Sequence, residues 1–61
     1  MIEFRLHFNI GNDAVQTPED VAAILQDIAS RIEEYSSLSE MRSGKNISDL
    51  NGNLIGSYIV K

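Results

Sequence analysis

The chain has 61 residues and no cysteine, and its nine acidic and five basic side chains give a net charge of −4 at pH 7. A chain this short should form a single domain, residues 1–61. The lack of cysteine excludes disulfides and thiolate sites. Small domains without such cross-links often gain stability by oligomerising, so we expect a homodimer. The acidic balance disfavours direct binding to nucleic acid, since lysine and arginine supply most of the affinity for phosphate, and it favours basic proteins as partners.

The first predicted element is a β-strand over residues 2–10. Every second side chain is apolar and those between are polar, which is the alternation of a strand with one buried face. The segment has neither the basic start nor the continuous apolar run of a signal peptide, and no stretch reaches the ~20 apolar residues of a membrane span. The sequence therefore predicts a cytoplasmic protein that does not enter a membrane. The core residues predicted from this strand are Ile2, Phe4, Leu6, Phe8 and Ile10.

The next predicted element is a helix from about Pro18 to Tyr35. Thr17 supplies a hydroxyl cap, proline suits the first helical position, and Asp20 completes an aspartate version of the capping box. Apolar residues recur at steps of three and four along the segment, which indicates one buried side. The core residues predicted from this helix are Val21, Ile24, Leu25, Ile28 and Ile32.

Acidic side chains on and just after the helix form the densest charge feature. The polar residues 36–44 are predicted to be a loop, with one further helical turn allowed at Ser37-Leu38-Ser39-Glu40. The acids are interpreted either as a solvated helix face or as an anionic docking surface for a basic groove of a partner, including a groove that normally holds nucleic acid. The residues of this acidic face are Glu19, Asp20, Asp27, Glu33, Glu34 and Glu40.

A hairpin is predicted at the end of the sequence, with strands over residues 45–50 and 54–60. Asn51-Gly52 between them is the strongest short-range signal for a hairpin turn. Two registers fit the pattern. If the loop holds only these two residues, in a type I′ turn, Ile47 shares a face with Tyr58 and its apolar neighbours.

The second register, which we prefer, has the loop Leu50-Asn51-Gly52 with Gly52 as a left-handed bulge. Asp49 then lies opposite Asn53, and the turn is formed by Asp49, Asn51, Gly52 and Asn53. The β-branched side chains that this register turns towards the helix are Ile47, Ile55 and Ile59. It leaves an exposed apolar face, which usually marks an interface. The oligomer interface predicted in this way is formed by Leu54, Tyr58 and Val60.

No group of residues predicts catalysis, a cofactor or a metal site. Asp49, Asn51 and Asn53 match the first oxygen ligands of a calcium loop, but the glycine and the bidentate glutamate that such a loop requires are missing. His7 is the only histidine, and we interpret it as a solvated or interfacial residue on the polar face of the first strand. A nucleophile, a base and an orienting group cannot be assembled from these residues, so the chain is not expected to be an enzyme.

Two segments, Gly11-Asn12-Asp13-Ala14 and Asp49-Leu50-Asn51-Gly52-Asn53-Leu54-Ile55-Gly56, carry a family resemblance. They resemble a family of small orphan proteins of phages and prophages, in which a strand ending in Gly-Asn-Ala-Ala precedes a short helix and the hairpin reads Asp-Ile-Asn-Gly-Asn-x-Val-Gly. The chain departs from that pattern at Asp13, Leu50 and Ile55. Small acidic phage proteins include inhibitors of host defence nucleases, anti-CRISPR proteins among them, and the resemblance implies an anti-defence protein of the host bacterial cytoplasm.

The elements together predict an α+β domain of βαββ type. The helix returns the chain, so placing the third strand between the other two keeps every pair antiparallel and gives the order first, third, second, with the single helix on one face. The function expected is non-catalytic protein binding of phage type, such as inhibition of a host defence complex. Two alternatives remain open: a structural or assembly homo-oligomer of a phage or prophage, and small-ligand or nucleotide binding at a dimer cleft.

Overall fold

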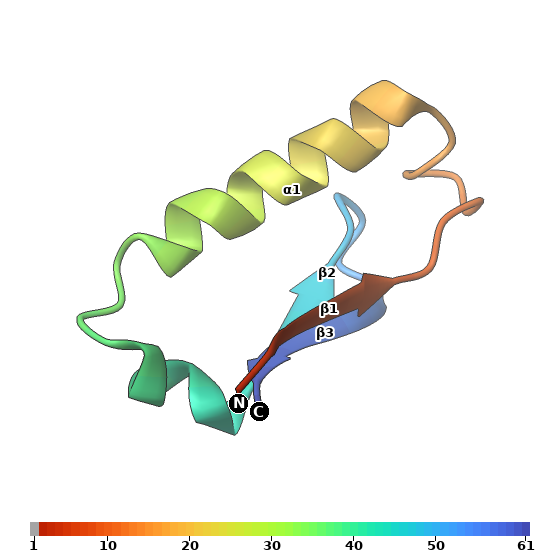
Figure 1. Cartoon of the computed structure of the whole chain (residues 1–61). Coiled ribbons are helices and arrows are strands. Elements are labelled where there is room, and N and C mark those ends of the chain that lie inside the picture. Colours follow the sequence, from red (N-terminus) through yellow and green to blue (C-terminus); the bar gives the residue numbers. More distant parts are fainter. Residues whose placement is uncertain (1) are drawn as a thin grey trace.

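The computed structural model describes residues 2–61, which form a three-stranded antiparallel sheet with a helix across one face (Figure 1). Strands β1 (Phe4–Phe8), β3 (Leu54–Val60) and β2 (Lys45–Ser48) lie in the order β1-β3-β2. Helix α1 (Pro18–Ile32) and the 3₁₀ helix η1 (Leu38–Ser43) connect β1 to β2. The predicted βαββ fold and strand order are confirmed. Neither helix in this part of the chain is long and apolar enough to cross a lipid bilayer.

Helix α1 begins with the predicted cap. The Thr17 hydroxyl accepts a hydrogen bond from the Asp20 N–H at 3.1 Å, and the Asp20 carboxylate accepts from the N–H groups of Gln16 and Thr17 at 2.9 and 3.1 Å. The helix ends at Ile32 rather than at Tyr35, because the chain tightens there and the Tyr35 N–H bonds to the Ile32 carbonyl. The predicted start of the helix is therefore confirmed, and its predicted end is too long by one turn.

The polar segment after α1 contains a helix where a loop was predicted. In η1 the Glu40 carboxylate accepts hydrogen bonds from the N–H groups of Ser36 and Ser37, so a local acid fixes the start of the turn. This turn packs against β3 and buries the Met41 side chain. The loop prediction is wrong for Leu38–Ser43, and Met41 is a core residue that the helix and strand patterns did not include.

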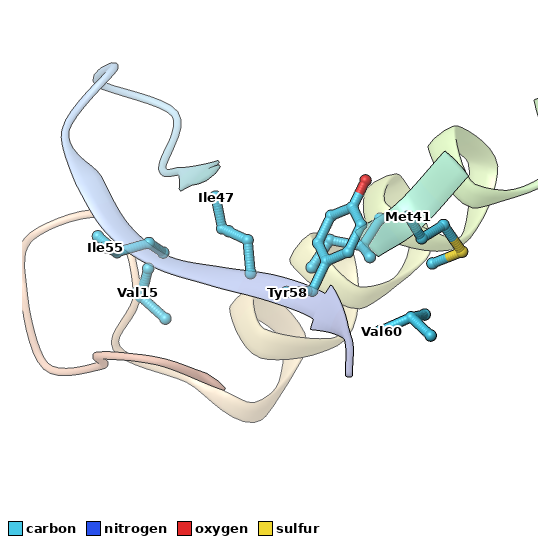
Figure 2. Close-up of a cluster of buried hydrophobic side chains, with 7 residues drawn as sticks. Val15, Met41, Ile47, Ile55, Tyr58 and Val60 are labelled. Atoms are coloured by element: carbon cyan, nitrogen blue, oxygen red, sulfur yellow. The ribbon is translucent and has the colours of Figure 1, made fainter. Parts of the chain in front are cut away.

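The core is a thin layer between α1, η1 and the sheet. Figure 2 shows the buried side chains extending along β3, from Val15 and Ile55 at one end to Met41 and Val60 at the other. The buried members are Val15, Ile28, Met41, Ile47, Ile55, Tyr58 and Val60. The half-buried side chains packed against them are Leu6, Phe8, Ala14, Val21, Ile24, Ile32 and Tyr35.

Several predicted core residues lie at the surface instead. A single helix of 15 residues does not cover the full width of the sheet, and the side of α1 next to β1 stays open. The predicted core residues that are exposed there are Ile2, Phe4, Ile10 and Leu25.

The hairpin has the preferred three-residue loop. The Asp49 N–H bonds to the Asn53 carbonyl at 3.0 Å, and Gly52 has a φ of +81°. A type I′ turn would need a positive φ at Asn51 as well, and only glycines have a positive φ among the described residues. The pairing of Asp49 with Asn53 and the left-handed Gly52 are confirmed.

A second bulge, inside β3, was not predicted. Ile47 lies opposite Gly56, but the next residue of β2, Ser48, lies opposite Leu54. The residue Ile55 is therefore the extra one, and the alternation of faces reverses along β3 at this point.

This bulge changes which side chains β3 buries. Ile55 is buried as predicted, but beyond the bulge Tyr58 and Val60 face the core, with 3% and 4% of their surface exposed, while Ile59 lies on the opposite face of the sheet. Leu54 alone remains exposed, at 65%. The prediction that Leu54, Tyr58 and Val60 form one exposed interface is wrong, because two of the three are core residues.

Candidate functional site

The predicted acidic face does not form one continuous surface. Asp20 and Asp27 lie on the side of α1 that faces β2, and Glu34, two residues after the end of α1, lies beside the same strand. The remaining acids lie on the outward side of α1, directly after its last residue and in η1. These are Glu19, Glu33 and Glu40.

Some of these carboxylates already have partners within the chain. The backbone N–H groups of Gln16 and Thr17 hold the pKa of Asp20 below its ordinary value, so this acid serves the start of α1. Glu40 has the corresponding role at the start of η1. Asp27 forms an exposed ion pair with Arg31 at 3.1 Å, one helical turn away. The acids with no capping role beside β2 are therefore Asp27 and Glu34.

A groove of about 420 Å³ runs between α1 and β2. Its floor is apolar because the buried faces of helix and sheet meet there, and it is formed by Ile24, Ile28, Ile47 and Tyr58. Its rims are polar and carry both charges, and they are formed by Asp20, Asp27, Arg31, Asn46 and Ser48. The groove thus offers apolar contact at its base and hydrogen-bonding groups at its margins.

Strand β2 borders this groove and is an edge strand of the sheet. In the described part of the chain, Lys45–Ser48 make no backbone hydrogen bond beyond the ladder with β3. The N–H and C=O groups on the other side of β2 are therefore available. An edge strand beside a helix is the geometry in which an extended peptide adds to a sheet as a further strand.

Asp49 at the end of the groove is the centre of a polar network. Its carboxylate accepts hydrogen bonds at 2.9 Å from the backbone N–H groups of Asn51 and Asn53 and from the side-chain amide of Asn12. The Asn53 N–H is the main cause of a pKa below the ordinary value for Asp49, and the other two donors act in the same direction. The predicted turn residues thus come together around Asp49.

These donors occupy the carboxylate oxygens of Asp49, which stands at the first ligand position of the calcium-loop pattern. No group of three or more histidine, cysteine, aspartate or glutamate residues that could hold a metal occurs within residues 2–61. The arrangement around Asp49 stabilises the turn.

The open face of the sheet holds one pair that sequence reasoning missed. His7 and Ser57 lie opposite each other on β1 and β3, and His7 Nε2 is 3.2 Å from Ser57 Oγ. No hydrogen bond or ion pair among the described residues joins His7 to a carboxylate. Predicting this pair would require the register of β1 against β3, which the sequence pattern does not determine. A Ser-His pair without an orienting acid lacks the arrangement that activates a serine nucleophile.

The α1–β2 groove is the candidate site, since it is more enclosed than the hollows beside β1 and combines an apolar floor with charged rims. The hollows beside β1 are more open and almost wholly apolar. Comparison of the chain with protein-family models, with curated proteins and with solved structures gives no match.

Proposed function

We propose that the chain is a non-catalytic binding protein that holds an extended segment of a host protein in the α1–β2 groove. In this proposal it acts as a small acidic protein of phage type, in the bacterial cytoplasm, and inhibits a host defence complex by occupying a surface of one component. The observation that carries the proposal is the position of the groove between α1 and the available edge of β2, above an apolar floor.

The edge of β2 supplies the affinity that does not depend on the partner's sequence. An extended segment placed along Lys45–Ser48 would form main-chain hydrogen bonds with the strand, as in other cases of strand addition. Its alternate side chains would point to the groove floor, where Ile47 and Tyr58 lie. Specificity would then come from the fit of those side chains against the floor.

Charge favours a basic segment. Asp27 lies on the rim of the groove, Glu34 lies beside its continuation towards Lys45, and the whole chain carries −4. Arg31 offsets part of this charge through its ion pair with Asp27. Complementary charge would mainly raise the rate of association and disfavour acidic partners. A basic segment that normally contacts nucleic acid would carry the positive charge that complements this acidic surface.

The proposal is tested by filling the groove with a bulky side chain. Ala23 is exposed on the groove rim, so Ala23→Trp should block a bound segment, whereas Gln26→Trp adds the same side chain to the outward side of α1. Each variant is expressed in bacteria that carry one of a panel of defence systems, CRISPR–Cas nucleases among them, and phage plating is counted. Circular dichroism establishes that both variants fold.

The wild-type chain and Gln26→Trp should restore plating against one defence system, and Ala23→Trp should not. The proposal fails if no defence system is inhibited by the wild-type chain, or if Ala23→Trp inhibits as well as Gln26→Trp.

A further inference from the structure

We propose that two copies of the chain form a symmetric dimer through the outer edge of β1, on the side of the molecule away from the groove. The second copy covers an apolar surface that a single copy leaves exposed, here called the β1 seam. The exposed residues of the β1 seam are Ile2, Phe4, Ile10, Leu25 and Leu38. This inference goes beyond the proposed function, since it concerns a different surface and a different partner.

The residues of the β1 seam follow one side of the molecule. One apolar hollow joins Ile10 to the start of α1 at Val21, and another joins Phe4 to Ile32 near the end of α1. Leu25 lies between these ends, one turn after Val21 and two turns before Ile32, and 44% of its surface is exposed. Of the large apolar side chains found exposed in residues 2–61, only Leu50 and Leu54 lie elsewhere.

The surface of one copy is larger than a monomer of this mass should have. The chain exposes 4615 Å² at 6.8 kDa, whereas a folded monomer of that mass exposes about 4000 Å². The radius of gyration is 12.1 Å, against about 10.5 Å for a compact domain of this length. The excess of roughly 600 Å² approaches the ~800 Å² that each partner buries in a standard interface. A second copy on the β1 seam would cover surface of this order.

The backbone of β1 offers a free edge with which the same edge of a second copy can pair. Glu3 and Lys61 exchange both backbone hydrogen bonds, at 2.8 and 2.9 Å, and the Asn9 N–H bonds to Ile55. Hydrogen-bonded pairs alternate along an antiparallel ladder, so the residues between Glu3 and Asn9 that direct N–H and C=O groups outward are the even-numbered ones. These are Phe4, Leu6 and Phe8.

The edge of β1 has few of the features that prevent edge pairing. The strand contains no proline, no lysine and no bulge, and Arg5 is its one charged residue. A two-fold axis at Leu6 pairs the outward groups of two antiparallel β1 strands and places Phe4 opposite Phe8 of the second copy. Cross-strand aromatic pairs of this kind stabilise a sheet. The product is a six-stranded sheet in the order β2-β3-β1-β1-β3-β2.

The same axis brings the two α1 helices together. Leu25 is near the middle of α1, as Leu6 is of β1, so Leu25 meets Leu25 of the second copy. Ala22 and Ala29 flank Leu25 on the helix surface and are small enough to permit close approach. Both α1–β2 grooves remain open at the outer edges of the dimer, so the dimer would present two binding sites.

Sedimentation equilibrium over a range of concentrations tests the dimer. Leu25→Glu places a charge in the β1 seam, and Leu54→Glu is the matched control on the open face of the sheet, where Leu54 is 65% exposed. The wild-type chain should dimerise, Leu25→Glu should raise the dimer Kd at least about tenfold, and Leu54→Glu should leave it unchanged. A wild-type chain that is monomeric at roughly 1 mM, or a dimer that Leu25→Glu leaves intact, overturns the proposal.

Amide hydrogen exchange of the wild-type chain provides a second test that does not depend on a variant. The N–H groups of Phe4, Leu6 and Phe8 should exchange slowly at high concentration and quickly on dilution, while those of Arg5 and His7 stay protected by β3 at both concentrations. Equal exchange of the first three groups at both concentrations overturns the proposal. Failure of the dimer would leave the groove proposal unaffected, because Ala23→Trp probes the opposite side of α1.

Discussion

The Asn12 side-chain amide donates a hydrogen bond to Asp49 Oδ2 at 2.9 Å and so joins the loop after β1 to the β2–β3 turn. The same side chain accepts, through Oδ1, the N–H groups of Ala14 and Val15 at 3.0 and 2.9 Å. One amide therefore shapes the loop that inserts the buried Val15 and anchors the hairpin.

Asn12→Ala should lower the free energy of unfolding by about 1–3 kcal/mol, because it removes three hydrogen bonds and leaves partly buried groups without a partner. Urea unfolding at neutral pH measures the change. Asn9→Ala is the control, since the Asn9 side chain is exposed and makes no side-chain hydrogen bond among the described residues. A stability of Asn12→Ala equal to that of Asn9→Ala would contradict the anchoring role.

Protonation of Asp49 should lower the stability of the protein in acid. The pKa of Asp49 is lower in the folded protein than in the unfolded chain, where it is about 3.9. Its contribution is therefore complete above that pH and is lost as the pH falls through the lower folded value. Asp20 acts in the same direction. Asp49→Asn should reduce the loss of thermal stability between neutral pH and pH ~2 relative to the wild-type chain; an unchanged pH dependence would exclude this role.

Gly56 and Gly52 should respond differently to alanine. A Cβ on Gly56 would overlap the His7 carbonyl oxygen and lie 2.5 Å from Phe8 Cα, both in backbone that cannot move aside without separating β1 from β3. Gly52 has open space around it but a φ of +81°. Gly52→Ala should therefore lower stability by about 1–2 kcal/mol through backbone strain alone. Gly56→Ala should lower it by more than about 3 kcal/mol, and equal effects in thermal unfolding would disprove the close approach.

Substitutions of Tyr58 test whether the side chain of Tyr58, which follows the bulge in β3, faces the core. Its ring is buried beside Phe4 and its hydroxyl is 3.4 Å from that of Tyr35. Tyr58→Ala should destabilise the domain by about 3–5 kcal/mol, whereas Tyr58→Phe keeps the ring and should change stability by less than about 1 kcal/mol. An exposed Tyr58, as the sequence-based interface requires, would make both changes small.

The same side chain should produce an alkaline limit to stability. Burial, together with the Tyr35 hydroxyl, raises the pKa of Tyr58 to about 12. The folded protein thus favours the neutral phenol, and stability is lost as the pH rises from the ordinary tyrosine value near 10 towards the raised one. Absorbance titration follows the ionisation, and Tyr58→Phe should remove this loss.

Local signals were enough to predict the three strands, the start of α1 and the topology, although they missed η1 and placed the end of α1 one turn too late. The alternation in β1, the cap formed by Thr17 and Asp20, and the left-handed Gly52 are each set by a few neighbouring residues. Once the strands and the helix were assigned, antiparallel pairing left one compact strand order. These features could be predicted because each depends on backbone geometry within one turn or one strand.

The core and the site depended on contacts between distant residues. The bulge at Ile55 accompanies the approach of Gly56 to the His7 carbonyl, and these residues are far apart in sequence. Met41 enters the core only because η1 packs on β3. Helical periodicity placed Asp27 only on the polar face of α1, and its position on the rim of a groove depends on where β2 lies beside the helix.

The most direct test of the central claim is the affinity between the purified chain and the host protein recovered with it from cells whose defence it suppresses. Isothermal titration is carried out with the wild-type chain, Ala23→Trp and Gln26→Trp. If the α1–β2 groove holds the partner, Ala23→Trp should weaken binding at least about tenfold and Gln26→Trp should bind within about twofold of the wild-type chain. Equal binding of Ala23→Trp and the wild-type chain, or recovery of no host protein by the wild-type chain, would contradict the claim.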